Sequence, residues 1–380
     1  MNVLSLDVET TTYNKGNPFD PRNVLCTVAS PYNCWPIEYP NTGLYGHHLD
    51  EIKRQVFQTD VLVGFNIKFD LHWLRHYGIT EFQKKAIWDV QIAEYIISGQ
   101  QDRMLSLNEV LEKYGLPLKF DKVKDYWDRG IQTTEIPFDL LVEYNIDDST
   151  KTLEVFHLQY EKVRNTPLEN LIWVSGMDLL TLQEMEYNGI KWEVKRSRDM
   201  ARELSKERDQ IADKIQSRTP EIPVNLNSPA HVSALLFGGS YEYEIKVQDY
   251  KILKDGRTKP YLRTERMIAT FPRIVEPLKN KKNTKGYSVD EDHLVSVKKF
   301  LTVEARSMVK DILRYREIDK FINTYLLGIP LKIEEMNWQN NIMHGQFNQV
   351  TTRTGRLSSN EPNLQNLSGD SKELVVTRYE

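Results

Sequence analysis

The stretch "VLSLDVE" at residues 3–9 alternates apolar and polar side chains, and it constrains the fold more than any other part of the chain. Alternation with a period of two predicts a strand with one buried face. A second apolar run, "DVLVGFN" at residues 60–66, has the length of a buried strand. Helical patterns follow both runs, and strands that alternate with helices predict an α/β first domain.

Several helices of this domain carry start and stop signals. Residues 88–97 show helical periodicity with Asp89 as the N-cap, and Ser106 and Glu109 have the spacing of a capping box. Residues 138–160 are helical by periodicity.

The second half of the chain has a different pattern, with longer predicted helices. After Pro167 long helices are expected, and the highly charged stretch 194–218 has only a thin apolar stripe, which is typical of a projecting helix. Ser228 has the position of an N-cap before a short helix. An irregular or β-hairpin insertion with "KDGR" at 254–257 as its turn follows, and helical periodicity returns over 290–327.

Composition excludes several classes of protein. Forty per cent apolar residues and a formal net charge of −4 are typical of a globular protein. No run approaches the roughly 18 apolar residues of a membrane span, and no signal peptide is evident. We expect a cytoplasmic protein with no membrane partner. Cys26 and Cys34 are too few for a disulfide framework, so we expect them to be reduced and structural.

Charge is distributed unevenly. Residues 1–165 carry 17 Lys and Arg against 24 Asp and Glu, whereas residues 238–286 carry 12 against 6. A nucleic acid would bind more easily to the second stretch, although a solvated basic surface explains the same pattern equally well.

A pair of carboxylates lies at the end of the first predicted strand. Asp7 and Glu9 are two residues apart, so both side chains leave the same face. Two acids so close repel each other unless a cation lies between them. Most such pairs only decorate an exposed strand, so the pair by itself is weak evidence for a site.

Two further segments add to this pair. Asp70 follows a strand-like run and lies four residues after Asn66, and Tyr144 and Asp148 share one helix face at the spacing i, i+4. Oxygen ligands of this kind suit Mg²⁺ or Mn²⁺ rather than zinc.

The ordered motifs D-x-E, N-x-x-[FY]-D and Y-x-x-x-D resemble those of the proofreading 3′→5′ exonucleases of the DEDD class, in the tyrosine variant. The resemblance implies a ribonuclease-H-like fold and two-metal phosphodiester hydrolysis, with the metals about 3.5–4 Å apart. It implies that Asp7, Glu9 and Asp148 hold one cation and that Asp7 is shared with a second one, which Asp70 helps to place. Tyr144 would orient the nucleophilic water.

Two neighbours of these residues are assigned by the same resemblance. Asn66 is expected to support the site by hydrogen bonding and to contact DNA. Asp147 is ambiguous because it adjoins Asp148, but the spacing from Tyr144 favours Asp148, and Asp147 is then a carboxylate on the helix surface.

The C-terminal half carries a second resemblance. The segments "EMEYNGIKWE", "VNLNSPAHVSALLFG", "KGYSVDEDHL", "ILRYREIDKFINTYLLGIP" and "TGRLSSNEPNLQN" are similar, in this order, to the thumb and palm entrance of family A DNA polymerases, the group of bacterial DNA polymerase I and many phage replicases. The implied domains are a 3′–5′ exonuclease at 1–165, a mainly α-helical thumb at 166–330 with an insertion at about 238–283, and the first strands of a palm at 331–380. A phage-encoded protein would act in the cytoplasm of its bacterial host.

The resemblance also implies DNA contacts. Arg356 would reach the minor groove of a primer–template duplex, where base pairs look alike, and Gly355 would let the strand come close. Asn363, Gln365 and Asn366 are expected to add further contacts. Single-stranded 3′ ends are the expected substrate of the exonuclease.

The residues that add nucleotides in this family are not found. Neither the D-x-S-x-x-E-type strand, nor a fingers helix, nor the second palm aspartate occurs in the sequence. We expect the N-terminal subunit of a split polymerase, completed by a second polypeptide with the rest of the palm and the fingers; an artificial truncation is the competing explanation. A non-catalytic DNA-binding scaffold and an exoribonuclease are alternatives from other classes.

The insertion departs from the usual thumb. Its basic charge and interleaved tyrosines fit an extended DNA contact or a docking site for a processivity factor, and a solvated hairpin is an equal alternative. Thioredoxin is disfavoured as that factor, because phage relatives that recruit it carry their loop before the "NLNSP"-like element.

Overall fold

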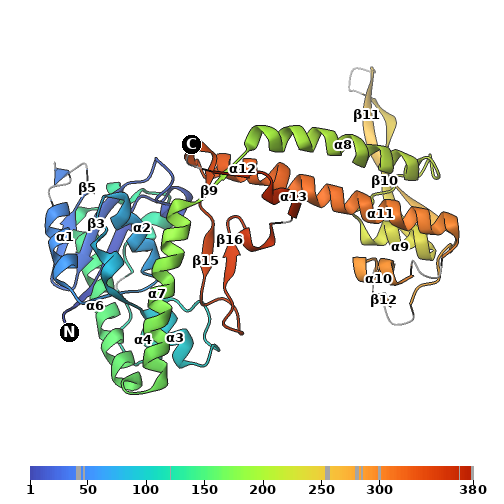
Figure 1. The fold of residues 1–380 in the computed structure, drawn as a ribbon. Helices are drawn as coiled ribbons and strands as arrows, with labels where there is room; N and C mark the ends of the chain where they lie inside the picture. The colour runs from blue at the N-terminus through green and yellow to red at the C-terminus, as the bar shows by residue number, and fades with distance from the viewer. Residues whose placement is uncertain are drawn as a thin grey trace. The chain divides into compact units, whose positions relative to one another are not determined.

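The computed structural model divides into two compact units. The first comprises residues 1–193 and 329–380, and the second comprises residues 194–328 (Figure 1). The structure describes residues 1–39, 44–45, 48–119, 121–252, 257–278, 282–283, 286–297, 301–367 and 369–377.

A mixed sheet forms the centre of the first unit. Its strands are β1 (Val3–Ser5), β2 (Asp7–Thr10), β3 (Leu25–Ser30), β4 (Asn33–Pro36), β7 (Val61–Gly64) and β8 (Ala86–Asp89), and β5 (Glu38–Tyr39) pairs separately with β6 (Leu44–Tyr45). β1, β7 and β8 are parallel, whereas β2, β3 and β4 are antiparallel. The N–H of Leu6 donates to the carbonyl of Val63 at 3.0 Å, which joins the two halves. Both predicted strands are confirmed.

Helices surround this sheet, and their ends follow the capping signals. They are α1 (Leu49–Gln58), α2 (Lys68–His76), α3 (Val90–Ile97), α4 (Leu107–Lys113), α5 (Lys124–Asp128), α6 (Phe138–Val163) and α7 (Pro167–Asn188). The Asp89 side chain accepts the N–H groups of Gln91 and Ile92 at 2.9 and 3.0 Å, and the capping box of Ser106 and Glu109 is formed. These caps satisfy donors that the first helical turn leaves free.

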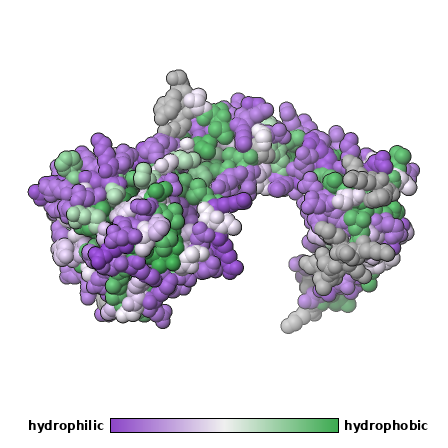
Figure 2. Space-filling model, turned by 60° about the horizontal axis from the view of Figure 1, so that its bottom comes forward, coloured by the Kyte–Doolittle hydropathy of each residue, from purple (hydrophilic) through white to green (hydrophobic). Residues whose placement is uncertain are grey.

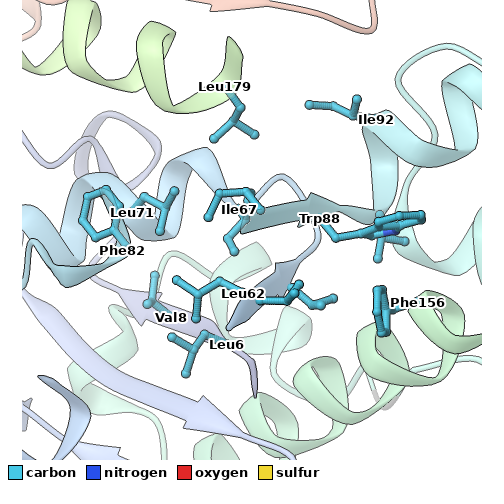
Figure 3. Packing of buried hydrophobic residues seen from close by; sticks show 14 of the residues in the cluster. Leu6, Val8, Leu62, Ile67, Leu71, Phe82, Trp88, Ile92, Phe156 and Leu179 are labelled. Carbon is cyan, nitrogen blue, oxygen red and sulfur yellow. The ribbon is translucent and has the colours of Figure 1, made fainter. Parts of the chain in front are cut away.

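The core of the first unit lies between the sheet and its helices (Figure 3). Leu6, Leu62 and Trp88 enter it from strands, and the ring of Phe156 on α6 meets Trp88 edge to face at 5.4 Å between centroids. Leu179 reaches the same cluster from α7. The apolar face predicted from the first alternating stretch is therefore the buried one.

Helix α7 belongs to the first unit, although the sequence pattern grouped it with the thumb. It packs on β8, and a Cβ added at Gly176 would lie 2.1 Å from the carbonyl oxygen of Ile87, so only glycine allows this close approach. The division between compact units falls at 193/194 and 328/329. The domain boundaries near 165 and 330 stay a prediction.

The residues from 329 onwards add short strands to the first unit. β9 (Ile190–Trp192) pairs with β14 (Ile342–Met343) and β17 (Val375–Val376), β15 (Gln346–Asn348) pairs with β16 (Ser358–Asn360), and α12 (Gly328–Glu335) and α13 (Gly369–Lys372) complete this part. Short helical turns of 3₁₀ type occur at Tyr13–Gly16, Glu81–Lys84, Thr133–Glu135, Gln339–Asn341 and Leu364–Asn366.

The second unit is mainly helical. It contains α8 (Val194–Gln216), α9 (Pro229–Phe237), β10 (Gly239–Ile252), β11 (Thr258–Phe271), β12 (Lys282–Asn283), β13 (Gly286–Tyr287), α10 (Glu291–Val297), α11 (Val303–Phe321) and a π-helical turn at Ile322–Leu326. The cap of α9 by Ser228 and the β10–β11 hairpin are confirmed, while the predicted turn at 254–257 includes residues outside the described ones. The helical stretch predicted over 290–327 is divided, because Thr302 caps a new helix through the N–H of Ala305.

The predicted fold class is confirmed: an α/β domain with a mixed sheet is followed by a mainly helical region and short strands. On the face shown in Figure 2, hydrophilic side chains predominate and hydrophobic ones form separate patches. Among the described residues, no helix is both long enough and apolar enough to pass through a bilayer.

Candidate active site

Three carboxylates meet at one end of the mixed sheet. Asp7 and Glu9 come from β2 and Asp148 from α6, and one oxygen of each lies within 4.8 Å of the others. Strand β2 and helix α6 pack together, so residues that are 139 positions apart share one small volume. The donor set consists only of carboxylate oxygens, which is the chemistry that Mg²⁺ and Mn²⁺ prefer.

Asp7 is oriented by a buried amide. The Nδ2 group of Asn145 donates to Oδ2 of Asp7 at 2.6 Å, and the hydroxyl of Thr27 donates to Oδ1 of Asn145 at 2.9 Å. Asn145 and Thr27 are both completely buried. This chain fixes one oxygen of Asp7 and leaves the other directed away from the amide, an arrangement typical of residues that orient metal ligands.

Lys119 lies beside the other side of the cluster. Its Nζ donates to Oδ2 of Asp148 at 2.8 Å and to the hydroxyl of Tyr144 at 2.6 Å. The remaining oxygen of Asp148, Oδ1, is buried without a hydrogen-bond donor. A buried carboxylate oxygen without a partner is costly, and a cation would satisfy it. The residues present therefore fit a divalent ion.

The pKa values of the cluster support the same conclusion. Burial, followed by the charge of Asp148, raises the pKa of Asp7 to about 8. Burial and the charge of Asp7 raise the pKa of Glu9 well above its ordinary value. Burial works against the Lys119 ammonium, but Asp148 outweighs it and the pKa of Lys119 is raised. One lysine does not neutralise three carboxylates, so the cluster favours a bound cation or a proton.

Asp70 reaches the site from α2 but holds a different position. Its Oδ1 accepts the backbone N–H of Val8 at 2.9 Å, and among the described residues it is not a member of the three-carboxylate group. Burial, followed by the nearby charge of Asp7, raises the pKa of Asp70. It therefore belongs to the same electrostatic cluster without sharing the common set of ligand atoms.

Asn66 lies on the wall of a cavity whose lining includes none of the four carboxylates. The residue has a φ of 56°, and the neighbouring N–H of Ile67 donates to Oδ2 of Asp89 at 2.9 Å. The cavity has a volume of about 490 Å³ and lies within the first unit. Its lining includes Phe65, Asn66, Phe69, Met104, Asn348 and Gln349. Aromatic and amide side chains next to Asp70 offer stacking surfaces and hydrogen bonds.

A buried ionic network ties β15 to the helices. Oε1 of Glu186 accepts the N–H of Phe347 and the ammonium of Lys68, each at 2.6 Å, and Oε2 contacts Nε2 of His72 at 2.8 Å. Lys68 also donates to the carbonyl of Phe347. Burial raises the pKa of Glu186, but the hydrogen bond from His72 and the charge of Lys68 outweigh it, so that pKa is lowered overall.

The residues predicted to hold duplex DNA lie on the surface of the first unit. Arg356, Asn363, Gln365 and Asn366 are all exposed. Gly355 has a φ of 72°, which lets the chain turn before β16. The side chain of Asn363 accepts the N–H of Gln365 at 3.1 Å and so caps its own turn. In the sequence, Arg356 is more than 200 residues away from Asp148, the cluster residue nearest to it.

Some functional residues carried no sequence signal. Lys119 lies in an irregular stretch outside every motif, and Asn145 lies within "EYNIDD" at a position that the Y-x-x-x-D motif does not specify. Asp147 pairs with Lys151 at 2.9 Å, in agreement with its interpretation as a helix-surface carboxylate. Cys26 and Cys34 are both free thiols, as expected.

Comparison with protein families agrees with this geometry. Residues 1–161 match the 3′-5′ exonuclease family, and residues 194–379 match DNA polymerase family A. The chain combines a 3′-5′ exonuclease domain with a region of DNA polymerase family A. The carboxylate cluster lies inside the first match, and Arg356 lies inside the second.

Curated relatives are DNA polymerases I of bacteria. The chain is 29% identical over 324 residues to that of Bacillus subtilis, which is 84% of this chain and 30% of the relative. It is 26% identical over 307 residues to that of Borreliella burgdorferi, which is 80% of this chain and 28% of the relative. The chain thus spans less than a third of the length of these relatives.

A shorter segment is more similar. Over 64 residues, or 17% of this chain and 7% of the relative, the chain is 45% identical to the thermostable DNA polymerase I of Thermus thermophilus. Among solved structures, the POL domain of Pol1 from M. smegmatis, in complex with DNA primer-template and dNTP, matches 98% of this chain and 53% of its own. The TM-score is 0.66 at 17% identity, which supports the fold.

Proposed function

We propose that this protein is a Mg²⁺- or Mn²⁺-dependent 3′→5′ exodeoxyribonuclease that also grips primer–template DNA. The observation that carries the proposal is the convergence of Asp7, Glu9 and Asp148, with one buried oxygen of Asp148 lacking a donor. The family matches make DNA the expected substrate.

The chain's own residues have separable roles in this reaction. Asp7, Glu9 and Asp148 would hold one ion, and Asp70, whose charge acts on Asp7, would help to place a second. When bound, the ions supply Lewis acidity that activates water and stabilises the charge developing on the scissile phosphate.

Tyr144 and Lys119 position the attacking water. Burial, followed by the charge of Glu9, raises the pKa of Tyr144, so the hydroxyl keeps its proton at neutral pH. Lys119 donates to that hydroxyl and thereby fixes the direction in which Tyr144 can donate its own proton. A water held by Tyr144 would face the phosphate at the carboxylate cluster.

The cavity lined by Asn66 and by Phe69, the residue before Asp70, is the proposed place for the last nucleotides of a single strand. Asn348, at the end of β15, and Gln349 also line it. Phosphate contacts through exposed residues such as Arg356, Asn363, Gln365 and Asn366 would hold the duplex without reading its sequence.

Nuclease assays test the proposal. Asp7→Ala should abolish Mg²⁺-dependent shortening of a 5′-labelled single-stranded oligonucleotide, which the wild type shortens stepwise from its 3′ end. Asp147→Asn is the matched control, because its carboxylate pairs with Lys151 and should leave the rate within about twofold. If Asp7→Ala keeps full activity, the assignment of Asp7 to an exonuclease metal site is wrong. Faster cleavage of RNA than of DNA would support an exoribonuclease instead.

We further propose that a second polypeptide in a split polymerase supplies the residues for nucleotide addition. The motifs that add nucleotides in family A do not occur in this sequence. Primer extension should appear only when this chain is mixed or co-expressed with a polypeptide that carries the remaining palm and the fingers. Exonuclease-dead protein that still binds primer–template DNA would favour the scaffold alternative.

A further inference from the structure

The β10–β11 hairpin is a long ribbon that packs on α9. Its two strands have 14 residues each and are paired along their whole length, and their far ends extend beyond α8 of the same unit (Figure 1). At the base, the ring of Tyr241 stacks on His231 with 3.7 Å between centroids, and its hydroxyl donates to the carbonyl of Pro223 at 2.9 Å. These contacts of Tyr241 hold the base of the ribbon in place.

Burial is confined to one face at the base of the ribbon. Tyr241 and Ala269 on that face are 6% and 2% exposed. The opposite face is open to solvent from base to tip, because Ile268 near the base is 69% exposed and Leu262 and Ile252 near the tip are 63% and 73% exposed. An isolated two-stranded ribbon is only marginally stable in water. Apolar side chains at the end of such a ribbon are typical of a surface that contacts a partner.

The register gives the tip two different faces. Lys251 stands directly opposite Lys259 on one face. On the other face Tyr250 stands opposite Pro260, and Leu262 lies on the same face two pairs further from the tip. One face of the tip is therefore basic and the other is apolar.

The basic face has excess positive charge. Like charges directly opposite each other destabilise a strand pair. The nearby carboxylate of Asp249 is already paired with Arg263, and that of Glu244 is paired with Arg266. Within the described residues no carboxylate pairs with either facing lysine. An anion bound there would relieve the repulsion between them.

We propose that the tip of the β10–β11 ribbon is an arm that binds duplex DNA, with Lys251 and Lys259 on phosphates and the apolar face of Tyr250 and Leu262 in the groove. The proposal rests on the proposed function, which brings duplex DNA to this chain. The major groove admits a two-stranded β-ribbon, and apolar side chains can wedge against base steps. Duplex DNA complements both faces at once, because it presents regularly spaced phosphates beside an apolar surface of stacked bases.

The test is the salt dependence of binding to a primer–template duplex, followed by fluorescence anisotropy in EDTA to prevent cleavage. The variant Lys251→Gln/Lys259→Gln should bind about tenfold more weakly at low salt, and its log–log salt slope should fall by about 1.8, since each phosphate contact contributes about 0.9. Replacing two facing lysines by glutamine removes a repulsion, so the ribbon should keep its structure.

Two further variants separate the contributions. Tyr250→Ala/Leu262→Ala should weaken duplex binding while leaving the salt slope unchanged, because no charge is removed. The matched control is Lys53→Gln/Lys84→Gln, two exposed lysines of the first unit, which should leave both affinity and slope near wild type.

The outcomes distinguish this proposal from the one on which it rests. An unchanged slope and affinity in Lys251→Gln/Lys259→Gln, with single-strand exonuclease intact, overturns the DNA arm and leaves the proposed function standing. Binding of poly-L-glutamate that depends on the two lysines, without an effect on DNA, assigns the ribbon to an acidic protein and also overturns the proposal. If the wild-type protein itself shows no exonuclease activity, that result contradicts the proposed function instead.

Discussion

Replacing Glu186 by glutamine should loosen β15 from the body of the first unit. Glu186 is only 4% exposed, and its two oxygens serve Lys68, His72 and the N–H of Phe347. A glutamine at this position keeps one carbonyl oxygen as an acceptor. Its amide NH₂ group replaces the other oxygen and, at the Oε1 position, would face the N–H of Phe347 and the ammonium of Lys68, which are both donors. The Lys68 ammonium, whose side chain is only 15% exposed, then remains buried without its carboxylate.

The expected cost is large. Breaking a buried ion pair by removing one partner typically costs about 3–5 kcal/mol. For a unit of this size that corresponds to a Tm lower by roughly 6–20 °C. If the lost stability is that of the local opening of β15, amide exchange at Phe347 should accelerate by about two to four orders of magnitude, since each 1.4 kcal/mol is tenfold.

Urea unfolding and hydrogen exchange of the wild type and Glu186→Gln provide the measurement. The matched control is Glu184→Gln on the same helix, which pairs with Arg75; the Glu184 side chain is 45% exposed and that of Arg75 is 13% exposed. Because water reaches the Glu184 side chain and can replace part of the lost interaction, this control should lose much less stability than Glu186→Gln. A Glu186→Gln protein as stable as Glu184→Gln, with unchanged exchange at Phe347, would refute the reasoning.

Three further predictions concern the site and the core. Asn145→Ala should lower kcat of the exonuclease about 10–100-fold with little change in KM, measured on single-stranded oligonucleotides, because Asp7 loses the donor that orients it. Without divalent ions, Tm should fall as pH rises from about 4 to 8. The reason is that Asp7 keeps its proton in the folded protein, with a pKa of about 8, but loses it near pH 4 in the unfolded chain. Asp7→Asn should flatten this dependence, and Mg²⁺ should raise Tm most at the high-pH end. Gly176→Ala should destabilise the first unit measurably in urea, because the new methyl group would meet the backbone of Ile87 at 2.1 Å; a stability equal to wild type would show that α7 can shift without cost.

Local patterns predicted much of the architecture because they depend on near neighbours in the chain. The capping box of Ser106 and Glu109, the cap by Asp89 and the alternation before Asp7 are all satisfied within a few residues. Order and spacing of the acidic motifs were enough to name the cluster residues. The division of the helical stretch 290–327 was missed because it depends on the cap by Thr302, a weak signal inside a continuous periodic pattern.

Long-range contacts decided the rest. Helix α7 joins the first unit because the absent side chain of Gly176 lets it approach β8, and periodicity contains no information about which neighbour a helical face meets. Lys119 and Asn145 enter the site from a loop and a buried helix face. Their roles follow from distances that only the folded chain creates.

The sequence by itself determined which side chains are available, namely four acids and a tyrosine, and where helices and strands are favoured. Both follow from the identity of each residue and its near neighbours. Only the tertiary structure decided that Asp70 would bond to a backbone N–H while three other carboxylates share one volume, and that Glu186 would hold the strand at Phe347. The physical reason is that burial and charge neutralisation depend on which surfaces pack together, and packing partners here are separated by more than a hundred residues.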